Sequence, residues 1–160
     1  MKRAGSFTQP NVHSESYFVA YSVVACERCS LATGVVCVGV TAGHQRLIDD
    51  EWIAIDSPAL LFQVEYLDSA VVLVLQQLSP KFCIAAAGTG WGEYWLNHCQ
   101  HCGAPQDDYW LHCEPGAAFL PVDSTDTGRM DLVAVHEPFF ATAVGFSERF
   151  GAIPPPETMG

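Results

Sequence analysis

Apolar stretches separated by short polar segments run through most of the chain. Residues 17–25 and 34–41 are the longest of these stretches, and 52–55, 60–66 and 132–136 are shorter ones. They are rich in valine, isoleucine and aromatic residues, which favour strands because their side chains pack well on a pleated surface. The pattern therefore predicts a β-rich domain.

One stretch, residues 68–78, is compatible with either a strand or a helix. Its valines favour a strand, whereas Asp68 or Ser69 at its start and Pro80 beyond its end suit a helix. Apolar residues also recur on one helical face, at positions 71, 74, 75 and 78. We favour the helix.

Two further segments, residues 82–87 and 91–97, are expected to pair as a hairpin around the turn Gly88-Thr89-Gly90. The turn lacks the Lys-Ser/Thr pair of a phosphate-binding loop, so it does not indicate a nucleotide site. Residues 139–150 are compatible with a strand or a helix, and both stay open. One helix among many strands makes the predicted fold class α+β and β-rich.

Polar segments flank this core at both ends. Residues 1–15 are polar and interrupted by Pro10, so we expect a flexible N-terminal arm. Residues 151–160 contain three consecutive prolines and are expected to form an extended, flexible tail. A length of 160 residues fits one domain, which we place at residues 16–150.

The composition excludes global disorder, because apolar residues make up 49% of the chain and charged residues only 16%. The longest apolar run, residues 70–75, is far shorter than the roughly 20 residues that span a bilayer. Polar residues follow Lys2 and Arg3, so we expect no secretory signal and a cytoplasmic location.

The net charge is −11, from 7 basic and 18 acidic residues. Nucleic acids and anionic membranes attract basic surfaces, so we expect neither direct nucleic-acid binding nor membrane binding. A protein partner with a basic surface fits the charge, since complementary potentials speed encounter. Two acidic clusters, Asp107-Asp108 and residues 123–131, lack the spacing of a calcium loop and are expected to be solvated.

Two CxxC motifs are the strongest chemical signal in the sequence. Cys26 and Cys29 form the first motif, and Cys99 and Cys102 form the second. Two such turns supply the four soft ligands that tetrahedral zinc accepts, so we predict that these cysteines share one structural Zn²⁺. Four thiolates and one Zn²⁺ would take the net charge from −11 to about −13.

The gap of about 70 residues between the motifs exceeds the ~15–20 of familiar zinc ribbons. Much of the domain therefore lies between the two halves of the predicted site. Metal binding would close this long loop and organise the fold, so removing the metal is expected to destabilise the protein.

Other ligand sets and a redox role remain open at this point. Cys113 is the strongest competing ligand, and histidines near the second motif are weaker ones, namely His98, His101 and His112. A CxxC pair can also act as a redox dithiol. Cys37 and Cys83 have apolar neighbours, so we expect buried, inert thiols there.

The downstream third of the chain resembles a family of uncharacterised bacterial zinc-ribbon proteins with the pattern YWxNxCxHCGAxQGDxxLHxEPGxxFxP. The matching residues are YWLNHCQHCGA at 94–104, Gln106, Asp108, LH at 111–112 and EPGAAFLP at 114–121. An upstream CxxC before the valine-rich residues 35–38 is also similar. The resemblance implies a zinc-ribbon-type domain with two CxxC knuckles, separated by a long insertion that carries strands and one helix.

This sequence departs from that pattern at two turn positions. Asp107 and Ser30 stand where the family has glycine. Aspartate tolerates turn conformations, so we expect altered turn detail and retained cysteine geometry. The resemblance implies a fold and a metal but no activity.

Our leading functional hypothesis is a zinc-stabilised acidic protein-interaction module, inhibitor-like, immunity-like or regulatory, without catalysis. A zinc ion with four thiolate ligands has no open position for a substrate or water. One alternative is a redox- or zinc-sensing switch that acts through the CxxC pairs. The other is a zinc-dependent hydrolase, which requires Cys113 or a histidine to replace one CxxC sulfur.

Overall fold

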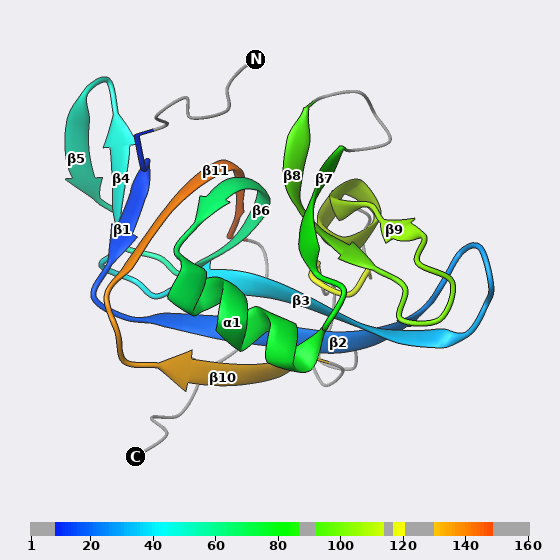
Figure 1. Ribbon diagram of the computed structural model, residues 1–160. Helices are drawn as coiled ribbons and strands as arrows, with labels where there is room; N and C mark the ends of the chain where they lie inside the picture. Colours follow the sequence, from blue (N-terminus) through cyan, green and yellow to red (C-terminus); the bar gives the residue numbers. More distant parts are fainter. Residues whose placement is uncertain (1–8, 87–91, 114–116, 121–129, 149–160) are drawn as a thin grey trace.

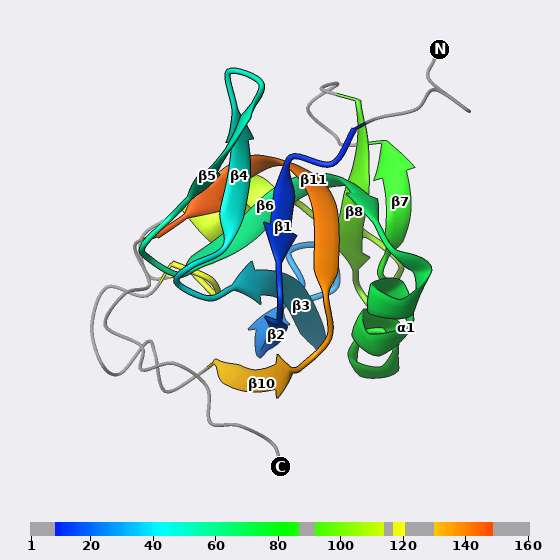
Figure 2. The same cartoon turned by 90° about the vertical axis from the view of Figure 1, so that its left-hand side faces the viewer.

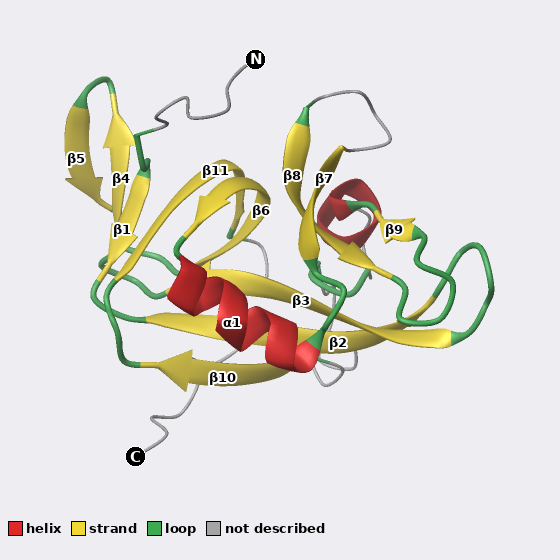
Figure 3. Cartoon of the chain, in the orientation of Figure 1, coloured by secondary structure: helices red, strands yellow, loops and turns green. Residues whose placement is uncertain are grey.

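The computed structural model describes residues 9–86, 92–113, 117–120 and 130–148. Within these residues the chain forms an eight-stranded sheet and a three-stranded sheet, with one α-helix and a short π-helical segment (Figures 1 and 3). The strand-rich prediction is confirmed, and the segment between the two CxxC motifs carries strands and the helix. The zinc-ribbon assignment stays a prediction.

All strand pairs in both sheets are antiparallel. The larger sheet has the order β10-β2-β3-β6-β11-β1-β4-β5, and the smaller has the order β7-β8-β9. In chain order the elements are β1 (Val12–Ser14), β2 (Tyr17–Ala25), β3 (Ala32–Val40), β4 (Gln45–Ile48), β5 (Glu51–Ala54), β6 (Ala59–Leu67), α1 (Ser69–Leu78), β7 (Cys83–Ala86), β8 (Glu93–His98), β9 (Pro105–Gln106), the π-helical segment (Tyr109–Cys113), β10 (Asp131–Val135) and β11 (Phe139–Ser147).

The β2–β3 hairpin is buried on both faces along β3 and along the N-terminal part of β2. Its two strands pair continuously from Tyr17↔Val40 to Ala25↔Ala32. Alternate side chains enter two different cores, because successive residues of a strand point to opposite faces. Val19 and Val38 lie in one core, and Phe18 and Cys37 lie in the other. This double burial explains why the β3 sequence is almost continuously apolar.

The favoured helix at residues 68–78 is confirmed as α1, which lies across β2 and β3 (Figure 1). Its Val71 and Leu75 are buried in the core that contains Val19 and Val38. Asp68 occupies the N-cap position without a side-chain capping bond, since its Oδ1 accepts a hydrogen bond from Tyr66 at 3.1 Å. Beyond the helix, the buried Ser79 hydroxyl donates to the Gly34 carbonyl at 3.2 Å.

The flexible arm that we predicted for residues 1–15 extends too far, because its last residues belong to the folded domain. Val12–Ser14 form β1, which pairs with β11 on one side and β4 on the other, and Val12 is fully buried. The preceding Asn11 extends this pairing through its side chain, which donates to the Ala143 carbonyl at 2.8 Å and accepts from the Ala143 amide at 3.0 Å. A three-residue strand carries too little periodicity to be recognised in sequence.

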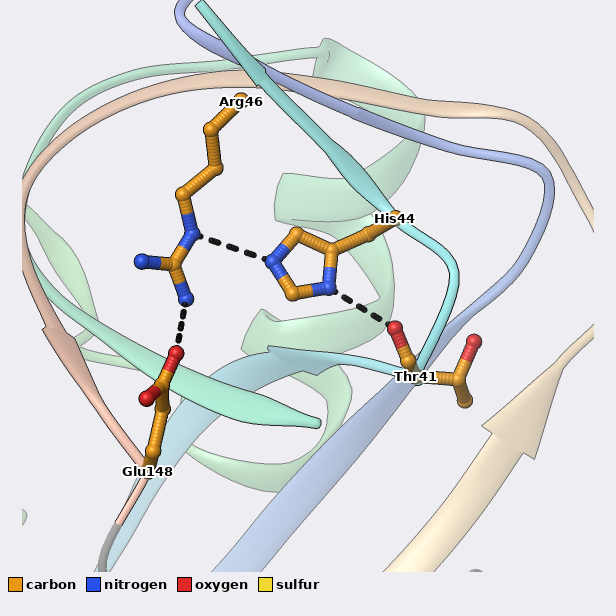
Figure 4. Close-up of polar contacts among 4 residues, drawn as sticks. All are labelled: Thr41, His44, Arg46 and Glu148. Carbon is orange, nitrogen blue, oxygen red and sulfur yellow. Dashed lines mark hydrogen bonds and ion pairs between the residues drawn. The ribbon is translucent and has the colours of Figure 1, made fainter. Parts of the chain in front are cut away.

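A polar network connects β4 to the C-terminal end of β11 (Figure 4). Arg46 donates from Nε to His44 Nε2 at 3.1 Å and from Nη2 to Glu148 Oε2 at 2.8 Å. Burial lowers the pKa of His44, so the ring is neutral. Its Nε2 accepts from arginine, and therefore Nδ1 carries the proton and donates to the Thr41 carbonyl at 2.8 Å. This network fixes the start of the projecting β4–β5 hairpin (Figure 2).

The remaining predictions divide between confirmed strands and segments outside the described residues. The predicted pairing of residues 82–87 with 91–97 is confirmed for β7 and β8, and the open segment at 139–150 is a strand, β11. The turn Gly88-Thr89-Gly90, most of the acidic loop at 123–131 and the tail at 151–160 lie outside the described residues. In the described part of the chain, neither helical segment has the length and hydropathy needed to cross a bilayer.

Candidate metal centre

The fold brings all four cysteines of the CxxC motifs together. Cys26 and Cys29 lie in the turn between β2 and β3, and Cys99 and Cys102 lie in the turn between β8 and β9, which adjoins the first (Figure 1). The four Sγ atoms lie within 4.8 Å of one another. All four are free thiols. This donor set and spacing fit one tetrahedral zinc ion, for which these residues would be the ligands.

The two CxxC turns, which we call knuckle 1 (residues 26–30) and knuckle 2 (residues 99–103), share the same backbone hydrogen bonds. In knuckle 1, Ser30 N donates to the Cys26 carbonyl at 2.8 Å. In knuckle 2, Gly103 N donates to the Cys99 carbonyl at 3.0 Å. The first cysteine of each knuckle also donates its N–H to a carbonyl five residues further along, at 2.9 and 2.8 Å. Two distant segments therefore adopt one local structure.

Both knuckles require a left-handed residue after the second cysteine. Ser30 has φ 68° and Gly103 has φ 79°. Glycine adopts this region at no steric cost, whereas serine does not. The expected cysteine geometry is retained, and knuckle 1 with Ser30 has the same turn as knuckle 2 with Gly103. Serine takes the strained conformation because the surrounding hydrogen bonds hold it there.

Backbone N–H groups point at the sulfurs of the first cysteine in each knuckle. Arg28 N donates to Cys26 Sγ and His101 N donates to Cys99 Sγ, both at 3.3 Å. Backbone hydrogen bonds, with that from Cys29 the largest, lower the pKa of Cys26 to about 6. The Cys102 backbone N–H does the same for Cys99, lowering its pKa. These donors favour the thiolate, which is the form that binds zinc.

Cys29, the second cysteine of knuckle 1, has a raised thiol pKa rather than a lowered one. The backbone N–H of Leu31 favours its thiolate, but desolvation and the neighbouring thiols outweigh this bond and raise the pKa of Cys29 to about 11. The closest sulfur pairs join the two knuckles, Cys26 to Cys102 and Cys29 to Cys99, each at 3.6 Å. Four thiolates this close repel one another, and a divalent cation at their centre would relieve that repulsion.

Polar contacts hold knuckle 2 against β3. The buried Asn97 side chain accepts from Val36 N and donates to Val36 O, both at 2.9 Å. Gln100 N donates to Thr33 Oγ1 at 3.0 Å, and His101 Nε2 donates to a β3 carbonyl at 3.0 Å. The Gln106 amide reaches Cys26 Sγ at 3.5 Å. Side chains from the downstream half thus position the two halves of the site.

The competing ligands named from the sequence do not join the cluster. The group within 4.8 Å contains the four CxxC cysteines, and neither Cys113 nor a described histidine belongs to it. Cys113 is exposed. Cys37 is buried as predicted, but the prediction of a buried Cys83 is wrong, because the side chains of β7 are largely exposed on both faces of the smaller sheet.

The burial of two ionisable residues was not predicted from the sequence. Asp108, which we expected to be solvated, is buried and accepts a hydrogen bond from Gln63 N at 2.6 Å. Burial raises its pKa to about 7. His112 is buried between the rings of Phe62 and Phe119, and burial lowers its pKa to about 3. Neighbouring aspartates indicate a surface loop, so local sequence contained no signal of this burial.

Comparison with protein-family models, with curated proteins and with solved structures gives no match. The resemblance to bacterial zinc-ribbon proteins therefore rests on the residue pattern alone. The functional argument rests on the geometry of the site.

Proposed function

We propose that Cys26, Cys29, Cys99 and Cys102 hold one structural zinc ion, and that the protein is a zinc-stabilised acidic protein-interaction module. The observation that carries the proposal is the position of four free thiols within 4.8 Å, contributed by two segments far apart in sequence. Four thiolates would fill a tetrahedral coordination sphere and leave no position for water. The ion would then connect the two sheets rather than catalyse a reaction.

The interaction role is supported by charge and by surface chemistry. A net charge of −11 favours a partner with a basic surface and disfavours nucleic acids and anionic membranes. Trp110 and Tyr109, beside the knuckles, expose half of their surface. Exposed aromatic residues of this kind are typical of binding surfaces. An inhibitory or regulatory module in the cytoplasm fits this combination.

The metal part of the proposal is tested by metal analysis and X-ray absorption spectroscopy of freshly purified protein. We expect one zinc per chain with four sulfur ligands at about 2.3 Å. A nitrogen- or oxygen-rich ion, or a well-folded protein without metal, would contradict the proposal. The interaction part is tested by affinity capture at low and moderate salt. We expect basic partners that dissociate as salt rises, because screening weakens such contacts.

A redox- or zinc-sensing switch is the second candidate, and the short distances between the knuckles favour it. Each 3.6 Å sulfur pair joins one knuckle to the other. Hydrogen peroxide would remove two electrons and two protons from a thiol pair, form one disulfide and leave two waters. A sensor would release zinc at micromolar peroxide and form Cys26–Cys102 or Cys29–Cys99 disulfides, which peptide mass spectrometry detects. A structural site would retain its zinc.

The zinc-dependent hydrolase is the least supported candidate. It needs one CxxC sulfur outside the coordination sphere and a water in its place. The four sulfurs are close enough to bind one ion together, and Cys113 is not among them. An absorption spectrum with three sulfurs and one oxygen would favour this candidate over the structural site.

A further inference from the structure

A groove of about 460 Å³ lies directly beside the candidate metal centre. Knuckle 1 contributes Glu27 and Arg28 to its lining, and the segment after knuckle 2 contributes Gln106, Asp107 and Trp110. The Gln106 amide in this lining also contacts Cys26 Sγ at 3.5 Å. Since its walls come from knuckle 1 and from the segments that flank knuckle 2, the shape of the groove depends on the same contacts that hold the cysteines together.

The groove combines an aromatic surface with apolar contacts. Trp110 is 50% exposed, although its neighbour Leu111 in the same π-helical segment is buried in the core that contains Phe18 and Cys37. Asp107 holds the start of this segment, because its Oδ1 accepts from Tyr109 N at 3.0 Å. Leu96, Ala104 and Pro105 supply the apolar part of the lining. A rigid, half-exposed tryptophan can bind a cation on its face.

The charges around the groove favour a cation. Glu27 and Asp107 place two carboxylates in the lining, against the single guanidinium of Arg28. A zinc ion with four thiolates adds a formal charge of about −2 next to them. The whole chain is acidic as well, with a net charge of −11. A positively charged group therefore gains electrostatic energy here, and an anion is repelled.

We propose that this groove binds a lysine- or arginine-bearing extended segment of a protein partner, with the cation over the Trp110 ring and facing the carboxylates of Glu27 and Asp107. The inference rests on the proposed function, because the zinc centre joins the two walls and supplies part of the negative potential. It adds the location of the binding surface and the chemistry of the bound segment.

Two neighbouring residues of knuckle 1 carry opposite charges. Neutralising each of them is therefore expected to change the affinity for a cationic segment in opposite directions. Glu27 attracts a bound cation, whereas Arg28 repels it. Glu27→Gln is therefore expected to weaken binding, and Arg28→Gln to strengthen it. Both substitutions leave the backbone intact, including the Arg28 N–H that donates to Cys26 Sγ. Glu51→Gln on the distant β5 is the matched control for a general change in net charge.

The experiment uses the full-length, zinc-loaded protein and a fluorescein-labelled ten-residue peptide of alternating arginine and leucine. Fluorescence anisotropy at 50 mM salt measures its affinity, and a glutamate–leucine peptide and a labelled single-stranded DNA serve as competing probes. We expect binding of the arginine peptide alone. Trp110→Ala is expected to weaken binding at least about tenfold, as for an aromatic residue at the centre of an interface. Trp52→Ala, which removes an exposed tryptophan of β5, is expected to have no effect.

Amide and indole chemical shifts of the wild-type protein locate the peptide without any substitution. We expect the largest changes at the Trp110 indole and the Gln106 side-chain amide. Shifts confined to other surfaces, equal effects of Trp110→Ala and Trp52→Ala, or the same sign for Glu27→Gln and Arg28→Gln would overturn the groove proposal. Binding of the DNA or the glutamate peptide instead would also overturn it.

Failure of the groove proposal and failure of the proposed function are distinguishable in the same samples. Zinc content and thermal unfolding are measured on each variant before the titration. Protein that holds one zinc and unfolds cooperatively, yet binds the arginine peptide elsewhere or not at all, overturns the groove alone. Protein that folds and binds the peptide without zinc overturns the zinc-stabilised function instead.

Discussion

Knuckle 1 and knuckle 2 have the same turn but are supported in different ways. Knuckle 1 is the tip of the β2–β3 hairpin, whose strands are nine residues each and pair along their whole length. Knuckle 2 connects β8 to β9, a strand of only two residues. The backbone ladder therefore holds knuckle 1 in place, whereas knuckle 2 relies on side-chain contacts with β3 and on the proposed metal ion.

The comparison teaches that one local structure can be stable for two different reasons. Regular pairing preorganises knuckle 1 before any ligand binds. For knuckle 2, the Asn97 side chain supplements the short β8–β9 ladder by bonding both polar groups of Val36. A metal bound between them would transmit the stability of the hairpin to the less supported half. Substitutions and metal removal can separate these contributions.

The largest expected effect follows from removing one sulfur. Cys99→Ser and Cys26→Ser are each expected to abolish zinc binding and to leave a poorly folded protein, because a missing ligand forfeits most of a binding energy of about 10–16 kcal/mol. Metal analysis and thermal unfolding measure both losses. Cys83→Ser, at an exposed cysteine outside the cluster, and Cys37→Ser are the controls and are expected to retain one zinc per chain. A Cys99→Ser variant with one zinc and unchanged thermal stability would refute the shared site.

Chelation of the metal is expected to affect the two knuckles unequally. After zinc removal, the amides of Cys99 and Gly103 are expected to lose protection from hydrogen exchange at least about tenfold more than the Val35 and Cys37 amides of β3, which face β2. The physical reason is that β3 keeps its ladder with β2, whereas knuckle 2 loses its strongest tether. Exchange measured by NMR with and without chelator provides the comparison. Equal loss in both regions would mean that the hairpin does not preorganise knuckle 1.

Removal of the Asn97 side chain measures how much its contact with Val36 contributes to stability and to zinc affinity. Asn97→Ala leaves the buried N–H and carbonyl of Val36 without their partner, which costs about 2–3 kcal/mol in unfolding free energy. It is also expected to weaken zinc binding, because knuckle 2 is no longer held against β3. Asn11→Ala breaks the same kind of contact, with Ala143, at the opposite end of the fold. It is expected to lower stability and leave zinc affinity unchanged, as measured by urea unfolding and chelator competition.

The smallest expected effect concerns the left-handed residue of each knuckle. Gly103→Ser is expected to destabilise the protein by about 1 kcal/mol, because serine pays a steric cost in this region. Ser30→Gly is expected to stabilise it by up to about 0.5 kcal/mol, since the greater entropy of glycine in the unfolded chain offsets part of the relief. Urea unfolding of both variants tests the pair. Changes of opposite sign in the unfolding free energy would support the equivalence of the two turns. A destabilising Ser30→Gly would contradict that equivalence.

Local sequence was sufficient to predict the long strands β2, β3 and β6, the helix α1 and the cluster of four cysteines. These features depend on short-range periodicity and on a fixed spacing between ligands, which are visible within a few residues. The same reasoning placed β2 at its observed bounds and recognised the β7–β8 pairing. It did not detect β1, β4 or β9, which are too short to show a period, and it left β11 open between strand and helix.

Only the tertiary structure decided which distant groups meet. The contact of Asn97 with Val36, the burial of Asp108 and His112, and the groove beside the metal centre all depend on segments that lie far apart in the chain. A polar side chain has the same local pattern whether it is solvated or bonded to a buried strand. Its environment is set by long-range packing, which no short window of sequence contains.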